Sequence, residues 1–146
     1  RSAKEGNVIS YIHPGAKLGV LLELNCETDF VSNTEDFKNL GNDIAMHIAA
    51  TNPLGVCRED IPEDVINKEK EIYSEQAKSS NKPDNIIEKM VEGRVNKYYK
   101  ENVLLEQDFV KDSNQTIEDL VTTTISKLGE NIVVTRFSRF QLGDKK

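Results

Sequence analysis

The chain of 146 residues has no tryptophan, only two cysteines and only two histidines. Cys26, Cys57, His13 and His47 do not have the spacing of zinc ligands, so we expect neither a bound metal nor another cofactor. The small number of cysteines favours a reducing compartment. No apolar run approaches the ~18 residues that a membrane-spanning helix requires, so we expect no membrane contact.

Basic residues are outnumbered: 19 lysines and arginines stand against 25 aspartates and glutamates, giving a net charge of -6. Binding to nucleic acid needs a basic surface, so we expect no direct nucleic-acid contact. Hydrophobic residues make up 37% and charged residues 30% of the chain, which is typical of a globular protein. The chain begins with Arg1 rather than methionine, so we expect a fragment or a processed form.

The sequence also lacks the common motifs of enzymes. It has no Gly-x-Ser-x-Gly, no phosphate-binding loop, no Gly-x-Gly-x-x-Gly and no His-Glu-x-x-His. Cys26 paired with a histidine could act as a thiol nucleophile, but its place at the end of an apolar strand favours a packed structural cysteine. The many carboxylates alternate with lysines at helical spacing, as on solvated helix faces. We therefore expect that the protein is not an enzyme.

Two strands are expected at the start of the chain, over residues 7–13 and 18–25. The dipeptide Pro14-Gly15 between them is a strong turn signal, so the strands should form a β-hairpin. Alternation in the second strand places three apolar side chains on one face: Val20, Leu22 and Leu24. A chain that opens this way is not a pure helical bundle.

The first helix is expected over residues 32–50. Ser32 and Glu35, three residues apart, fit a capping box at its start. The apolar stripe consists of Phe37, Leu40, Ile44 and Ile48, and a second apolar side consists of Met46, Ala49 and Ala50. A helix that is apolar on both sides should pack against its own core and against a second surface. At the edge of the stripe, His47 is expected to have a structural or subunit-interface role.

A helical hairpin is expected at about residues 62–101, with arms over residues 63–78 and 84–100. Pro62 suits the first turn of the first arm, and residues 79–83 form a polar connection. Both arms are highly charged, and their narrow apolar stripes can cover little besides each other. We therefore expect the hairpin to project from the rest of the protein.

The last part of the chain should return to the sheet. Residues 103–110 are expected to be extended or irregular. Thr116 caps a helix of period 3.6 that ends at Gly129 in a left-handed conformation, and residues 132–140 form a strand. The sequence thus predicts one α+β domain over residues 1–146, with a small antiparallel sheet packed against helices and the helical hairpin as an insertion.

The segment at residues 28–31 is the most informative candidate site, because it places an aromatic residue between a strand end and a helix start. In one interpretation Phe30 packs under the helix as a hydrophobic staple. In the other it projects as an apolar anchor beside Asp29, and such an anchor can carry most of the energy of an interface. The residues alone favour neither interpretation.

Four segments resemble the family of translation elongation factor Ts. Residues 23–31, Glu-Leu-Asn-Cys-Glu-Thr-Asp-Phe-Val, closely resemble the signature of that family. Residues 43–50 are similar to its second core helix, residues 87–94 to the second arm of its coiled-coil hairpin, and residues 127–132 to its helix-to-strand junction. Motifs that the long form divides between two core halves occur here in one half, which resembles the short form.

The resemblance implies a guanine-nucleotide exchange factor that binds elongation factor Tu·GDP and promotes GDP release so that GTP can bind. It implies that the aspartate and phenylalanine of the signature enter the GTPase near its magnesium site. The corresponding partner-binding residues of this chain are Thr28, Asp29, Phe30 and Val31. It also implies secondary contacts at His13, Leu128 and Gly129. The alternative is a ribosome-associated or structural interaction module of the same fold that has no exchange activity.

The resemblance to the short form further implies that two copies pair, and the two-sided helix at residues 32–50 agrees with this expectation. We expect a symmetric homodimer that can bind two molecules of elongation factor Tu. The expected location is the cytoplasm of a bacterium, or the plastid stroma or mitochondrial matrix if the protein is organellar.

Overall fold

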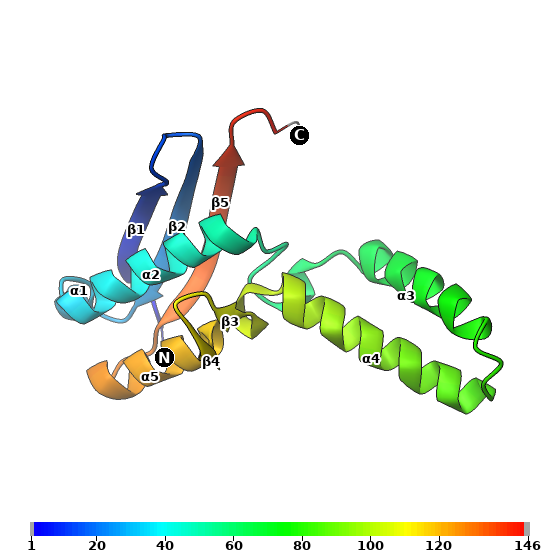
Figure 1. The fold of residues 1–146 in the computed structure, drawn as a ribbon. Helices are drawn as coiled ribbons and strands as arrows, with labels where there is room; N and C mark the ends of the chain where they lie inside the picture. The colour runs from blue at the N-terminus through cyan, green and yellow to red at the C-terminus, as the bar shows by residue number, and fades with distance from the viewer. Residues whose placement is uncertain (1, 145–146) are drawn as a thin grey trace.

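The structure is a computed structural model, and it describes residues 2–144. Three strands form an antiparallel sheet in the order β1-β2-β5 (Figure 1). The bounds of these strands are Glu5–Ile12 for β1, Leu18–Cys26 for β2 and Val133–Gln141 for β5. As expected, β1 and β2 form a hairpin whose turn contains Pro14 and Gly15, and β5 pairs with the other edge of β2.

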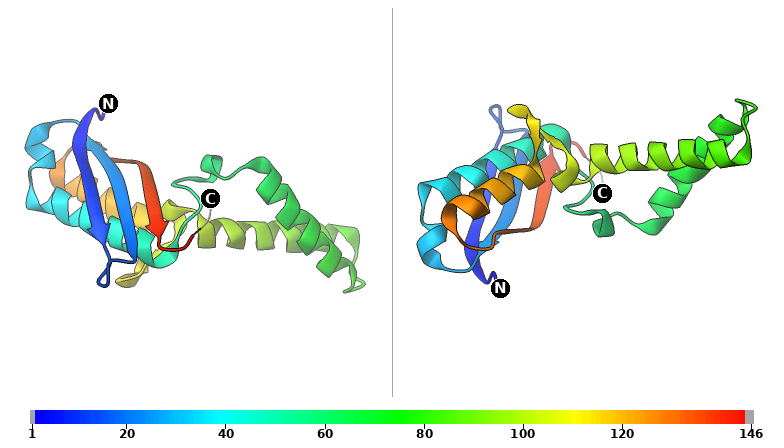
Figure 2. Two further views of the ribbon diagram at one scale, coloured as in Figure 1. Left: turned by 90° about the horizontal axis from the view of Figure 1, so that it is seen from above. Right: turned by 90° about the horizontal axis from the view of Figure 1, so that it is seen from below.

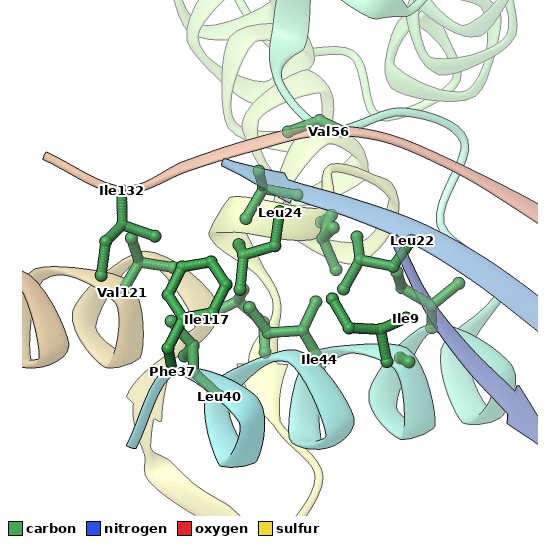
Figure 3. Packing of buried hydrophobic residues seen from close by; sticks show 14 of the residues in the cluster. Ile9, Leu22, Leu24, Phe37, Leu40, Ile44, Val56, Ile117, Val121 and Ile132 are labelled. Atoms are coloured by element: carbon green, nitrogen blue, oxygen red, sulfur yellow. The ribbon is translucent and has the colours of Figure 1, made fainter. Parts of the chain in front are cut away.

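One face of this sheet is covered by two helices, α2 (Glu35–Thr51) and α5 (Ile117–Leu128) (Figure 1). Side chains from the sheet and from both helices interdigitate in one core (Figure 3). The fully buried members include Leu22, Leu24, Phe37, Ile44, Ile48 and Ile117. The alternation predicted for β2 is therefore correct, and the protein has the α+β fold that the sequence predicts.

The expected capping box at Ser32 is wrong. A separate four-residue helix, α1 (Asp29–Ser32), comes first, and Ser32 is its buried last residue. The hydroxyl of Ser32 donates a hydrogen bond to the carbonyl of Asp29 at 3.2 Å, so it does not cap the next helix. Thr34 caps α2 instead, because its hydroxyl accepts the backbone N–H of Phe37 at 3.2 Å.

The second apolar side of α2 is partly covered by the protein's own chain. Ala49 is buried, and its carbonyl accepts hydrogen bonds from the guanidinium of Arg139 in β5 at 3.0 and 3.2 Å. Met46 is half-buried and Ala50 is exposed. Of this side of α2, Met46 and Ala50 therefore remain at least partly open to solvent, and Ala49 does not.

Two helices, α3 (Glu63–Lys78) and α4 (Asp84–Asn102), lie side by side and extend away from the sheet (Figures 1 and 2). They share a small cluster at their base, with Ile61, Ile66, Val95 and Val103 buried in it. Pro62 and Pro83 immediately precede the two helices, where their missing N–H groups cost nothing. The projecting pair agrees with the helical hairpin that the charge pattern predicts.

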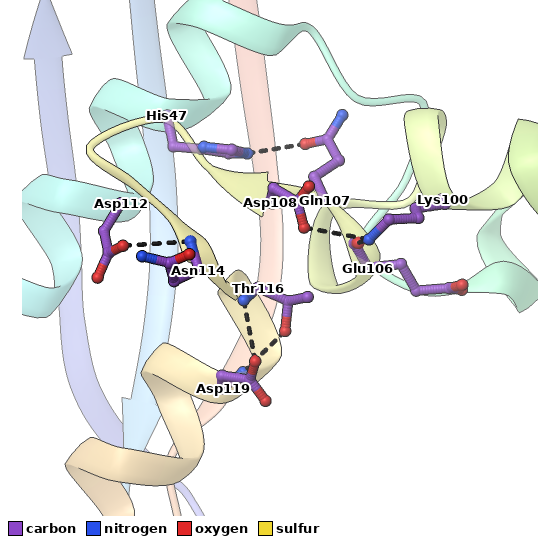
Figure 4. Close-up of polar contacts among 9 residues, drawn as sticks. All are labelled: His47, Lys100, Glu106, Gln107, Asp108, Asp112, Asn114, Thr116 and Asp119. Carbon is purple, nitrogen blue, oxygen red and sulfur yellow. Dashed lines mark hydrogen bonds and ion pairs between the residues drawn. The ribbon is translucent and has the colours of Figure 1, made fainter.

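The segment between α4 and α5 is more regular than expected. It contains a short antiparallel pair, β3 (Asp108–Phe109) and β4 (Asp112–Thr116). The sequence reasoning missed this pair because β3 has two residues and β4 has no apolar alternation. The expected cap of α5 is confirmed: the hydroxyl of Thr116 accepts the N–H of Asp119 at 3.1 Å, and the Asp119 carboxylate accepts the N–H of Thr116 at 3.0 Å (Figure 4).

A buried polar contact joins α2 to the base of α4 (Figure 4). The backbone N–H of Val110 donates to Nδ1 of His47 at 3.2 Å, so the other ring nitrogen, Nε2, carries the proton and donates to Oε1 of Gln107 at 2.9 Å. The amide of Gln107 donates in turn to the carbonyl of Glu101 at 2.8 Å. His47 is thus a structural residue, and burial lowers its pKa although the bond to Gln107 acts in the opposite direction.

We expect the protein to lose stability below about pH 6.5, because His47 titrates near that value when unfolded and the fold holds it neutral. The free energy of unfolding should fall by at most about 1.4 kcal/mol per pH unit from this group. Urea unfolding at pH 7.5 and 5.5 measures this change. His47→Gln should weaken the dependence, whereas His13→Gln, at an exposed histidine in the β1–β2 turn, should not. Equal pH dependence in all three proteins would contradict this.

Candidate functional site

Residues 28–31 lie at the end of the sheet opposite the β1–β2 turn, where β2 leads into α1 (Figure 1). Thr28 is the N-cap of α1, and its hydroxyl accepts the backbone N–H of Val31 at 3.4 Å. Neighbouring segments also hold α1: the side-chain amide of Asn7 in β1 donates to the carbonyl of Ser32 at 2.9 Å. The site is therefore built on the edge of the sheet rather than on a free loop.

Two adjacent apolar residues of this segment point in different directions. Val31 is buried and belongs to the core, whereas the side chain of Phe30 is 84% exposed. Asp29 beside it is also exposed. Since a hydrophobic staple requires a buried ring, the structure overturns the staple interpretation of Phe30. Val31 anchors the short helix in the core, and the ring of Phe30 faces solvent.

Two of the three residues expected as secondary contacts lie beside this segment. Leu128 packs partly against the core at the end of α5, and Gly129 follows it in the left-handed conformation with φ 76°. The next residue, Glu130, accepts a hydrogen bond from the hydroxyl of Thr28 at 2.6 Å. The junction between α5 and β5 and the segment at residues 28–31 thus form one surface region.

The third residue, His13, lies elsewhere. It belongs to the β1–β2 turn, where Nδ1 of its ring is 2.9 Å from the hydroxyl of Tyr11. The nine residues of β2 separate this turn from Cys26, which corresponds to about 26 Å at the rise of a strand. His13 therefore does not belong to the surface that contains Phe30, and any contact it makes with a partner is a separate one.

Cys26 lies beneath the segment and is fully buried. Its thiol donates to the carbonyl of Thr28 at 3.1 Å, and burial raises its pKa, with the nearby Glu130 acting in the same direction. Both ring nitrogens of His47 are engaged elsewhere. The structure therefore gives the thiol neither access nor a base, and it offers no support for a thiol enzyme.

Across residues 2–144, no group of three or more histidine, cysteine, aspartate or glutamate side chains could hold a metal ion. In the same part of the chain, no helix has the length and apolar character needed to cross a membrane.

The sequence reasoning missed the carboxylates of Glu27 and Glu130, which hold residues 28–31 in place. In the sequence, Glu27 stands out only as part of the segment at residues 23–31, and Glu130 only as part of the segment at residues 127–132. Their partners are about a hundred positions away along the chain, so no local pattern indicates the contact.

The sheet face opposite the helices carries several exposed apolar side chains. Those on the strands are Val8, Ile12, Leu21 and Phe140, and Leu142 follows β5. On the same face, Arg136 and Glu23 form an ion pair at 2.9 Å across β5 and β2. We call this surface the open sheet face.

Replacing Phe30 by alanine should change the free energy of unfolding by less than about 0.5 kcal/mol, because the ring is already in water. The matched control is Phe37→Ala, which removes a fully buried ring and should cost about 3–5 kcal/mol. Urea denaturation followed by circular dichroism compares the two variants. A similar loss in both would mean that Phe30 is packed.

Comparison with known proteins identifies the family. The family model described as Elongation factor TS matches residues 1–144. Curated proteins named Elongation factor Ts from Fervidobacterium nodosum, Syntrophus aciditrophicus and Thermoanaerobacter pseudethanolicus are 59%, 52% and 54% identical to the chain. Each match covers 99% of this chain and 71–73% of the relative. The chain therefore belongs to the elongation factor Ts family.

Proposed function

We propose that the protein is a guanine-nucleotide exchange factor that binds elongation factor Tu·GDP and promotes the release of GDP so that GTP can bind. Membership of the family supports this proposal. The observation that carries it is the exposed ring of Phe30, presented on a short helix that is fixed to the sheet. Since the relatives are bacterial proteins, the bacterial cytoplasm is the proposed place of action.

Exchange requires no covalent chemistry. A GTPase holds GDP through backbone amides of its phosphate loop and through a magnesium ion. A protein that binds the nucleotide-free form more tightly than the GDP-bound form must weaken GDP binding by the same factor, because the two couplings are reciprocal. A hundredfold weakening corresponds to about 2.7 kcal/mol of differential binding. One apolar anchor and its surroundings can supply this amount.

In this proposal each residue of the segment has a distinct part. Phe30 enters between side chains of the partner near its magnesium site, and Asp29 makes a polar contact beside it. Thr28 and Val31 keep these two residues in place, through the cap of α1 and the core respectively. Leu128 and Gly129 lie close enough to extend the same contact surface, and His13 makes a separate contact at the β1–β2 turn.

The alternative is an interaction module of the same fold that binds without accelerating exchange. It predicts binding to elongation factor Tu, or to the ribosome, that GDP does not oppose. The exposed phenyl ring beside a carboxylate is compatible with either function. Only a measurement of the rate of GDP release can distinguish the two.

The wild-type chain should accelerate the release of a fluorescent GDP analogue from elongation factor Tu, and Phe30→Ala should reduce this acceleration at least about tenfold, as expected for an anchor worth more than 1.4 kcal/mol. Stopped-flow fluorescence measures the release. The control is Ile72→Ala, which removes an exposed apolar side chain on the projecting helix α3, outside residues 28–31. Equal rates with wild type and Phe30→Ala would contradict the proposal.

We also propose that two copies pair through the open sheet face. This face exposes large apolar side chains on adjacent strands, and a twofold interface places the same patch of both copies in contact. The ion pair between Glu23 and Arg136 gives this face one positive and one negative charge. Two copies can therefore meet here without repulsion between like-charged surfaces. This surface replaces the second side of α2 as the candidate for the homodimer.

Light scattering after gel filtration at tens of micromolar should give twice the chain mass of 16.5 kDa. The double variant Leu21→Lys/Phe140→Lys should give the mass of one chain, because it places like charges on both paired faces. Ile72→Lys, on the projecting α3, is the matched control and should remain dimeric. A monomeric wild-type protein at this concentration would rule out the dimer.

A further inference from the structure

The position of Phe30 depends on contacts outside its own helix. The helix α1 has four residues, and a single helical turn is unstable by itself because nucleation fixes several dihedral angles for one hydrogen bond. The exposed ring contributes little packing of its own. The direction in which Phe30 points must therefore be set by the groups that hold the ends of α1.

Glu130, at the junction between α5 and β5, holds the N-terminal end. Its Oε1 accepts the backbone N–H of Glu27 at 3.2 Å and that of Thr28 at 3.1 Å. Its Oε2 accepts the hydroxyl of Thr28 at 2.6 Å. Charge-assisted hydrogen bonds of this kind are about twice as strong as neutral ones. Three of them converge on the two residues that immediately precede Asp29.

The contact is reciprocal. Oε2 of Glu27 accepts the backbone N–H of Asn131 at 2.6 Å. Each of the two loops therefore contributes one carboxylate that binds backbone N–H groups of the other loop. We call these four hydrogen bonds the carboxylate clasp. Since it joins residues about a hundred positions apart, it fixes residues 28–31 relative to the end of α5.

The base of the clasp is itself rigid. Leu128 packs against the core, and Gly129 turns the chain with φ 76°, a conformation that residues with a Cβ rarely adopt. This turn leads directly to Glu130. The carboxylate clasp thus connects the segment that carries Phe30 to the packed core.

We propose that Glu130 is a positioning residue for nucleotide exchange: it acts through residues 27 and 28 to present Phe30 in the orientation that the partner requires. This inference rests on the proposed function and goes further by naming what pre-organises the anchor. A segment that is already ordered loses less conformational entropy on docking, and a displacement of 1 Å can reduce a rate by a hundredfold.

The first experiment compares three substitutions of Glu130 in the GDP-release assay. Glu130→Ala removes every acceptor, Glu130→Asp keeps the charge but shortens the reach by one methylene, and Glu130→Gln keeps an acceptor oxygen at full length. We expect the second-order rate constant to fall at least about tenfold for the alanine and aspartate variants and to stay within about threefold for glutamine. Glu118→Ala, an exposed carboxylate on α5, is the control and should have the wild-type rate.

The opposite order, with aspartate active and glutamine inactive, would show that the charge of Glu130 matters more than its reach to residues 27 and 28, which contradicts the positioning role. Wild-type rates for all three variants would also overturn it. If Glu130→Ala does not fold, the rates of the aspartate and glutamine variants still test the positioning role of Glu130.

The second experiment is a double-mutant cycle with Phe30→Ala. If Glu130 acts through Phe30, then Glu130→Ala should change the rate less than threefold in the Phe30→Ala background. A loss of general stability would instead reduce the rate equally in both backgrounds, and that result would contradict the proposal. If Phe30→Ala leaves release unchanged, the proposed function fails together with this inference. If Phe30→Ala slows release and Glu130→Ala does not, only this inference fails.

A third measurement requires no partner. Amide hydrogen exchange of Thr28 and Val31 should become at least about tenfold faster in Glu130→Ala, whereas the amides of the core helix α5 should keep their protection. Unchanged protection of Thr28 and Val31 would show that the clasp does not order the segment.

Discussion

A phenyl ring in water is unfavourable by roughly 2 kcal/mol relative to a buried one, and this protein keeps such a ring at Phe30. In the proposed function, the ring is an effective anchor only if the backbone that carries it is fixed. That backbone is fixed by Val31 in the core and by the carboxylate clasp between Glu27 and Glu130. The sheet, α2 and α5 together support the segment that carries Phe30.

The proposed exchange activity follows from this arrangement by linkage. The protein needs only to prefer one state of its partner. A rigid anchor strengthens docking because little entropy is lost, and the preference itself comes from contacts that differ between the two states. The helical pair α3 and α4 is joined to the same support through His47 and Gln107, and Arg58 and Glu106 form a second contact at its base at 2.7 Å. Both projecting features, the ring and the helical pair, are therefore held by polar contacts on an apolar core.

Local signals in the sequence predicted the elements they specify. The Pro14-Gly15 turn, the alternation in β2 and the cap at Thr116 each depend on neighbouring residues, and each is correct. The errors have two sources: a competing local cap, and contacts between residues that are far apart in the sequence. Ser32 fits a capping box by spacing, yet the cap at Thr28 starts a separate helix before it. The clasp at Glu130 joins distant parts of the chain, so its role is visible only in the folded protein.

In the proposed function, docking of this protein and binding of GDP compete for the same free energy of the partner. Gel filtration of the chain mixed with nucleotide-free elongation factor Tu tests this most directly, with and without added GDP. We expect the two proteins to elute together and GDP to separate them, because reciprocal coupling requires each ligand to weaken the other. Co-elution that persists unchanged in excess GDP, or no co-elution at all, would contradict it.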